Sequence, residues 1–263
     1  MPKRSNNPQN SQTPSRRGGA PVPALNGGES NQWLSVSYQP VSLFSLKRSD
    51  ATSMAARSNL VPTPYAIKMA LLKVLLESEG ALHSSDFDEW IEGEFAWIRD
   101  LQIWVRPPER LVVNRNGYKL RYYDQTADKA DKTRLTLPMQ GGFVFREWIY
   151  LEGNLEIHCA ANDRSPALTQ LFAQINYFGK RGCFFQYLPD RTQITAEPLY
   201  QPNLSLSFTV GLMDDFGKNT TFDKINPFST KKAALDKERT ILTDFLPLKL
   251  TATSARYDFY QRL

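Results

Sequence analysis

Cysteine and histidine are scarce in this chain of 263 residues, and their scarcity limits the chemistry that it can support. Cys159 and Cys183 each lie in an apolar, strand-like run without CxxC spacing, so we predict reduced core residues and neither a metal site nor a cofactor. The only histidines are His83, which precedes a predicted helix, and His158, which lies within a strand-like run. A core or capping role is favoured for both over acid–base catalysis.

Long apolar runs and known catalytic motifs are absent as well. No window approaches the roughly 20 apolar residues of a membrane span, so we expect a cytoplasmic protein without a membrane partner. The sequence contains no GxSxG, HExxH, Walker or dinucleotide-binding motif, and the adjacent Asp214 and Asp215 have no acidic neighbours. These absences favour a protein that is not an enzyme.

Positive charge slightly exceeds negative charge. There are 32 Lys and Arg residues against 27 Asp and Glu residues, which gives a net charge of +5 and a pI near 9.1. Such an excess bears on partners rather than on fold, and only where it clusters. A cluster would suit nucleic acid, because neutralised phosphates release condensed counterions, but ordinary solvated surface charge explains the composition equally well.

The chain has enough apolar residues to build a substantial core, with 41% hydrophobic residues and a mean hydropathy of -0.44. Residues 1–30 are rich in Asn, Ser, Pro and Arg and lack an apolar period, which predicts a disordered basic tail. We expect one α+β domain over 31–189 and a smaller β-rich lobe over 190–263. Within that lobe we expect a strand near residues 204–210, a loop over 214–232 and strands in 241–260.

Three helices and several strands are predicted in the larger domain. Thr63 suits an N-cap, Pro64 suits the first helical position, and Gly80 suits the residue beyond the helix end. A second helix is expected from residue 84 or 85, and a third from Ser165. Strands are expected from Trp33, between residues 101 and 160, and over 183–187, with a hairpin turn at Asn116 and Gly117. The order β, α, several β, α, β predicts a ferredoxin-like unit with an inserted hairpin.

Cations and aromatic residues alternate between Arg106 and Arg146. The cations are Arg106, Arg110, Arg115, Lys119, Arg121, Lys129, Lys132 and Arg134, and the aromatic residues are Tyr118, Tyr122 and Tyr123. Guanidinium groups pair with phosphates and tyrosine rings stack on unpaired bases, so the stretch predicts an RNA-binding hairpin. An ordinary charged hairpin whose side chains keep a sheet edge soluble is the alternative. The turn Gly179-Lys180-Arg181-Gly182 is similarly open between an anion site and a simple tight turn.

Three motifs, in order and spacing, resemble the fifth family of CRISPR-associated proteins, which belongs to the RAMP superfamily. They are LVPTPYAIKMALL at Leu60–Leu72, FREW at Phe145–Trp148 and YFGKRGC at Tyr177–Cys183. The resemblance covers residues 33–187. It implies a ferredoxin-like (RRM-like) RAMP domain with a β-hairpin thumb at about 106–142, and a role in capping the 5′ end of CRISPR RNA in the Cascade complex.

The resemblance also implies the RNA contacts. Handle contacts would come from Arg115, Lys119, Arg121, Tyr122, Arg134, Arg146, Lys180 and Arg181, with Arg48, Arg57, Tyr65 and Lys68 around the first helix as further candidates. The implied partners are the 5′ handle of CRISPR RNA, a backbone subunit, a large subunit and target DNA near the PAM, in antiviral defence or RNA-guided DNA targeting.

One branch of this family cleaves repeat RNA with a set of tyrosine, lysine and histidine. Neither His83 nor His158 matches that set, so the resemblance favours a non-catalytic RNA-binding subunit. A metal-independent endoribonuclease that processes CRISPR repeat RNA is the alternative, and a structural protein without a nucleic-acid role is a third reading.

Overall fold

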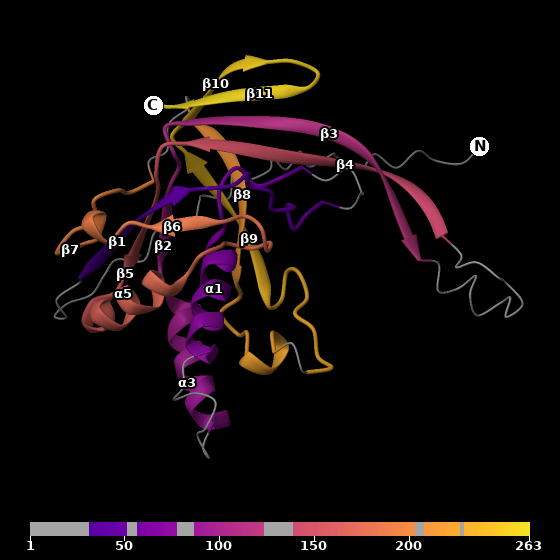
Figure 1. Cartoon of the computed structure of the whole chain (residues 1–263). Helices are drawn as coiled ribbons and strands as arrows, with labels where there is room; N and C mark the ends of the chain where they lie inside the picture. The colour runs from indigo at the N-terminus through magenta and orange to yellow at the C-terminus, as the bar shows by residue number, and fades with distance from the viewer. Residues whose placement is uncertain (1–31, 52–56, 78–86, 124–138, 203–207, 227–228) are drawn as a thin grey trace, which may run out of the picture.

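A computed structural model describes residues 32–51, 57–77, 87–123, 139–202, 208–226 and 229–263. The chain is a mixed α+β protein whose sheets are antiparallel, with helices on one side of the main sheet and a long hairpin that projects from the body (Figure 1). The predicted N-terminal tail, Gly80, His83 and Arg134 all lie outside the described residues. No helix within the described ranges is long and apolar enough to cross a membrane.

The main sheet is assembled from strands that are far apart in sequence. Its strands are β1 (Trp33–Pro40), β2 (Ile103–Arg106), β5 (Leu155–Ala160), β6 (Phe185–Tyr187) and β7 (Gln193–Thr195). They run in the order β2-β5-β1-β6, and β7 also pairs with β1. Leu34, Val36 and Tyr38 alternate along β1 and are fully buried, since successive side chains of a strand point to opposite faces.

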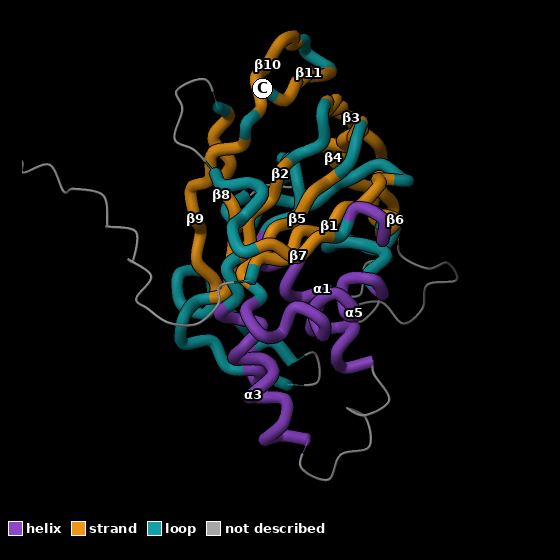
Figure 2. The backbone as a smooth tube through the Cα atoms, turned by 90° about the vertical axis from the view of Figure 1, so that its left-hand side faces the viewer, coloured by secondary structure: helices purple, strands orange, loops and turns teal. Residues whose placement is uncertain are grey.

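Three helices form a layer on one side of this sheet (Figure 2). They are α1 (Pro64–Glu77), α3 (Phe87–Asp100) and α5 (Ser165–Gln174), and the short 3₁₀ turns are Asn162–Arg164, Pro189–Arg191 and Phe222–Lys224. The predicted start of α1 is confirmed, because the Ala66 amide donates to Thr63 Oγ1 at 3.2 Å and Pro64 is the first helical residue.

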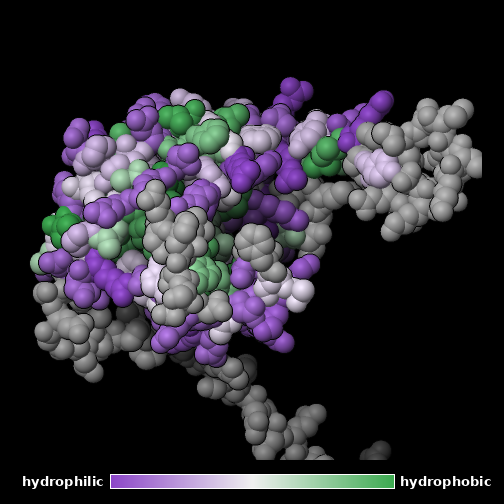
Figure 3. Space-filling model, turned by 60° about the horizontal axis from the view of Figure 1, so that its bottom comes forward, coloured by the Kyte–Doolittle hydropathy of each residue, from purple (hydrophilic) through white to green (hydrophobic). Residues whose placement is uncertain are grey.

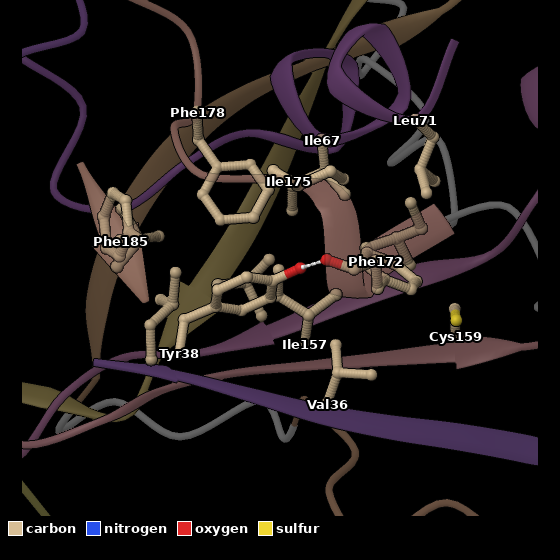
Figure 4. Packing of buried hydrophobic residues seen from close by; sticks show 14 of the residues in the cluster. Val36, Tyr38, Ile67, Leu71, Ile157, Cys159, Phe172, Ile175, Phe178 and Phe185 are labelled. Carbon is tan, nitrogen blue, oxygen red and sulfur yellow. Dashed lines mark hydrogen bonds between the residues drawn. The ribbon is translucent and has the colours of Figure 1, made fainter. Parts of the chain in front are cut away.

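The core lies between the sheet and the helices. The buried Tyr38 ring points from β1 towards α5, and its hydroxyl donates to the Phe172 carbonyl oxygen at 2.7 Å, which satisfies the one polar atom of the ring (Figure 4). Cys159 and Cys183 are buried free thiols, as predicted. Burial raises the pKa of Cys159 to about 12.

The hairpin is longer than the sequence predicted. Strands β3 (Arg110–Tyr123) and β4 (Met139–Glu152) pair without a break from Arg110↔Glu152 to Tyr123↔Met139. The predicted turn at Asn116 and Gly117 is therefore wrong. Gly117 lies inside β3, where an added Cβ would be 2.6 Å from Phe143 Cε1, so this glycine makes room for a ring of the opposite strand.

The C-terminal third contributes four more strands. They are β8 (Thr209–Phe216), β9 (Arg239–Leu246), β10 (Leu248–Thr253) and β11 (Tyr257–Arg262). Strands β8 and β9 pair with each other, whereas β11 pairs with β3 to form a sheet in the order β10-β11-β3-β4. The loop predicted from residue 214 is wrong at its start, because Asp214–Phe216 belong to β8 and pair with β9.

Candidate nucleic-acid interface

The three sequence motifs meet at one open cavity of about 610 Å³. The first turn of α1 contributes Thr63 and Tyr65, strand β4 contributes Arg146, and the turn before β6 contributes Tyr177 and Lys180. The other lining residues are Ser45, Leu46, Lys47, Ser49, Ala66, Met69, Ala70, Lys73, Gly179, Asp214 and Arg239. We call this space the motif cavity.

The motif cavity is strongly cationic. Five of its lining residues are Lys or Arg, and Asp214, the one acid among the described lining residues, is ion-paired with Arg239. Three of the cations lie over aromatic rings: Lys73 Nζ is 5.5 Å from the Tyr177 ring centroid, Lys180 Nζ is 5.3 Å from that of Trp148, and the guanidinium carbon of Arg239 is 4.2 Å from that of Tyr65. A cation–π contact does not neutralise a cation, although Lys73 also pairs with the exposed Glu77 at 2.7 Å. Such a wall can bind a polyanion.

Among the predicted site residues, Arg146 lines the motif cavity and has a buried donor atom without a partner. Its Nε atom is buried without a hydrogen-bond partner, and within the described ranges no carboxylate pairs with its guanidinium. An unpaired buried donor costs free energy unless a ligand satisfies it. Arg146 lines the motif cavity and is therefore available for binding.

Arg115, by contrast, is used within the fold. It pairs with Asp258 of β11, lies 3.5 Å from Glu147 Oε1 and donates to the Ser254 carbonyl oxygen at 3.0 Å. Because Arg115 is opposite Glu147 in the ladder and Glu147 follows Arg146, the two arginines lie on opposite faces of the hairpin. The structure thus assigns Arg115 to joining β11 with the hairpin, against its predicted role as an RNA contact.

Lys68 is also unsuited to the role that the sequence suggested. Its side chain is only 1% exposed, and its ammonium group lies 2.7 Å from Asp215 Oδ1 and donates to the Arg99 carbonyl oxygen at 2.8 Å. Burial lowers the pKa of Lys68, and the neighbouring Asp215 carboxylate opposes that change. A cation enclosed in this way cannot reach a phosphate.

Further predicted residues lie on the exposed surface. Lys119 and Arg121 are exposed near the far end of β3, on the same face as two half-exposed rings, those of Phe143 and Phe145, whose centroids are 4.9 Å apart. Hydrophobic side chains stand among hydrophilic ones along the projecting hairpin (Figure 3). Tyr122 belongs to β3, but its side chain lies outside the described residues.

The remaining predicted cations are near the ends of the motif segments. Arg181 is exposed in the turn after Lys180, where Gly179 and Gly182 have φ of 73° and 97°, values that favour glycine. Arg48 is held by Asp50 at 2.6 Å, and Arg57 is exposed. Arg181 and Arg57 can contact a ligand directly, whereas Arg48 would have to exchange its partner.

His158 is enclosed, as its sequence context predicted. It is 1% exposed, and its Nδ1 atom is 2.8 Å from Ser35 Oγ. Its Nε2 atom is buried without a hydrogen-bond partner and lies 3.7 Å from Glu156 Oε2. The described residues contain no group of three or more His, Cys, Asp or Glu that could hold a metal ion.

Sequence reasoning missed several lining residues, of which Lys73 and Arg239 are the most informative. Lys73 could have been found, because Tyr65, Met69 and Lys73 recur every four residues and so share one face of α1. Arg239 gave no local signal. It comes from β9, outside every motif, and only the fold brings it to the first turn of α1.

Comparisons with known proteins agree with the motifs. No family model matches the chain. A curated relative, CRISPR-associated protein Cas5 of Archaeoglobus fulgidus, is 24% identical in an alignment 212 residues long that covers 76% of this chain and 86% of the relative. A solved structure of a CRISPR protein from Archaeoglobus fulgidus has 11% sequence identity and a TM-score of 0.37, over 88% of this chain and 92% of that one. The curated match and the three motifs together support assignment of the chain to the Cas5 family of CRISPR-associated proteins.

Proposed function

We propose that this protein is a non-catalytic subunit that binds CRISPR RNA and holds its repeat-derived 5′ handle in the motif cavity. The complex would be of the Cascade type, with a backbone subunit and a large subunit as neighbours and target DNA near the PAM. Similarity to a curated Cas5 protein supports a CRISPR RNA context. The cations and rings of the motif cavity suit single-stranded RNA, which is bound through phosphate contacts and stacking.

We further propose that the main sheet is a ferredoxin-like domain and that the hairpin of β3 and β4 is its thumb. The strand order β2-β5-β1-β6, with α1 before β2 and α5 before β6, supports the first assignment. The position of the hairpin between β2 and β5, together with its projection from the body, supports the second (Figure 1).

The unpaired Arg146 is the observation that carries this proposal. The chain neutralises Arg115 with two carboxylates, yet it leaves Arg146 without one in a cavity shared with Lys180. A protein that needed these groups only for solubility would have no reason to bury the Arg146 Nε atom. Phosphate oxygens would supply the missing acceptors, and arginine can bind them in a bidentate manner.

RNA binding tests the proposal directly. The protein would be expressed with its CRISPR array, the co-purifying RNA sequenced, and the common 5′ segment used as a labelled probe. We expect the double variant Arg146→Gln/Lys180→Gln to bind this probe at least tenfold more weakly. The plot of log affinity against log salt concentration should become shallower by roughly 1.4, because each phosphate contact with a single strand contributes about 0.7.

Arg191→Gln is the matched control, because Arg191 is exposed and lies outside the motif cavity. It should leave both the affinity and the salt slope unchanged. Equal effects of the two variants would refute the site.

Incubation of the protein with repeat RNA in EDTA tests the non-catalytic role. If the RNA is cleaved and His158→Ala abolishes the cleavage, the protein is a metal-independent nuclease and not a non-catalytic subunit.

A further inference from the structure

Arg239 forms one wall of the motif cavity in an unusual way. It comes from β9, in the part of the chain that no family motif covers, and its guanidinium carbon lies 4.2 Å from the centroid of the Tyr65 ring. Tyr65 is the aromatic residue of the first motif and is half-buried at the start of α1. Its burial raises the pKa of its hydroxyl, although Arg239 opposes this effect, so the ring is neutral when it receives the cation.

The orientation of the Arg239 guanidinium is fixed from its edge. Nη2 pairs with Asp214, whose side chain is almost fully buried, and donates to Ser49 Oγ at 2.6 Å. Ser49 Oγ in turn donates to Asp214 Oδ2 at 3.0 Å. Asp214 and Ser49 contact the guanidinium at its Nη2 edge and Tyr65 contacts one of its faces, so none of these partners covers the other face. Arg239 lines the motif cavity.

The space beside Arg239 is suited to a flat, partly apolar group. On the α1 side of the motif cavity the apolar residues Ala66, Met69 and Ala70 lie between Tyr65 and Lys73, whereas the cations Arg146 and Lys180 come from β4 and the turn before β6. A nucleotide has the same division, with an apolar base and an anionic phosphate. The cavity volume of about 610 Å³ lies within the range of small-molecule sites, so a whole nucleotide can enter.

We propose that Arg239 stacks on one unpaired nucleobase of the bound RNA, with its guanidinium sandwiched between that base and Tyr65. This inference rests on the proposed function and adds to it a base-contacting residue outside the family motifs. Bases of single-stranded RNA stack on arginine planes as well as on aromatic rings. Because Asp214 and Ser49 already fix the plane, little side-chain entropy is lost when the base binds.

Single abasic substitutions along the RNA probe test the stacking. The probe is the 5′ segment sequenced from co-purified RNA, with one base removed at a time. Against the wild-type protein we expect one position whose removal weakens binding by about 5- to 150-fold. Arg239→Lys keeps the charge and can still pair with Asp214 but has no plane, so the penalty at that position should fall below twofold.

Tyr65→Phe is the matched control, because it keeps the ring under Arg239 and should keep the penalty. If Arg239→Lys lowers the melting temperature, the double variant Asp214→Asn/Arg239→Gln is used in its place, because it removes both charges of the ion pair together. A penalty that persists in the Arg239 variants, or equal penalties at every position, overturns the stacking site while leaving RNA binding intact. Failure of the wild-type protein to bind the complete probe overturns the proposed function, and the stacking site with it.

Discussion

Replacement of Lys68 by methionine is the most informative test of how the site is held in place. Lys68 lies one turn after Tyr65 on α1, and its ammonium group joins this helix to Asp215 of β8 and to the Arg99 carbonyl oxygen of α3. Methionine fills a similar volume but donates no hydrogen bond. The Asp215 carboxylate, whose side chain is 18% exposed, and the Arg99 carbonyl oxygen would lose this donor.

The expected cost follows from the burial of the pair. Removal of one partner of a buried ion pair typically costs about 3–5 kcal/mol, because the other charge remains buried without compensation. For a chain of this size each kcal/mol lowers the melting temperature by about 2–4 °C, so Lys68→Met should lower it by roughly 6–20 °C. Burial raises the pKa of Asp215, and the positive charge of Lys68 lowers it. Lys68→Met removes that opposing effect, so it should also favour the protonated form of Asp215.

Thermal melting at neutral pH measures the effect, and Lys73→Met is the control on the same helix. Lys73 pairs with Glu77 at 2.7 Å, but the two side chains are 40% and 61% exposed, so its loss should cost no more than about 0.5 kcal/mol. The double variant Lys68→Met/Asp215→Leu should recover most of the lost stability. Equal melting temperatures for the two single variants would refute the assignment of Lys68 to the core.

Three further predictions concern stability and reactivity. The pKa of Glu156, which burial would raise, is lowered to about 2 by the nearby His158 and by Arg106, whose Nη1 donates to Glu156 Oε2 at 3.0 Å. Glu156 therefore stabilises the fold above about pH 4.5, and up to roughly 3 kcal/mol is lost as the pH falls towards 2, a loss that Glu156→Gln should remove from acid titrations. Gly217→Ala should destabilise the fold by about 1–3 kcal/mol in denaturant melts, because the added Cβ would lie 2.3 Å from a backbone oxygen, whereas Gly141→Ala meets nothing within 4 Å and should be neutral. Neither buried cysteine should react with a thiol reagent in the native protein at pH 8, and both should react after denaturation; native labelling would contradict their burial.

Local features were predictable from the sequence because their causes are local. The Thr63 cap and Pro64 set the start of α1 through contacts within one helical turn. The same local reasoning failed at Asn116 and Gly117, where turn propensity competed with a ladder of cross-strand pairs and lost. A glycine in a strand and a glycine in a turn look alike until the ring opposite, Phe143, is placed.

The candidate site was only partly predictable, because residues that are far away in sequence decide which of its cations are neutralised. Alternation along β4 indicates that Arg146 and Glu147 point to opposite faces of the hairpin, but it does not indicate on which face an acidic residue of another strand will lie. One of the two carboxylates that neutralise Arg115 is that of Asp258, 143 residues later. Arg239 reaches Tyr65 by the same kind of long-range contact, which no spacing in the sequence reveals.

The uninterrupted ladder between β3 and β4 has a consequence for how the charge of the motif cavity is encoded. Side chains alternate along β4, so a shift of its register by one residue exchanges the faces of the whole strand. Deletion of a single residue between Gly142 and Arg146 has two possible outcomes. In the first, the pairs near the base of the hairpin are kept and the pairs towards its tip shift by one residue. In the second, the pairs near the tip are kept, the base shifts, and Glu147 moves to the cavity side in place of Arg146. In the second case Glu147 would take the place of Arg146 in the cavity wall and lower its net charge by two, although Lys47, Lys73, Lys180 and Arg239 would keep the wall cationic. The sign of the charge that β4 itself presents to the ligand is thus set by whether a residue count along the strand is odd or even.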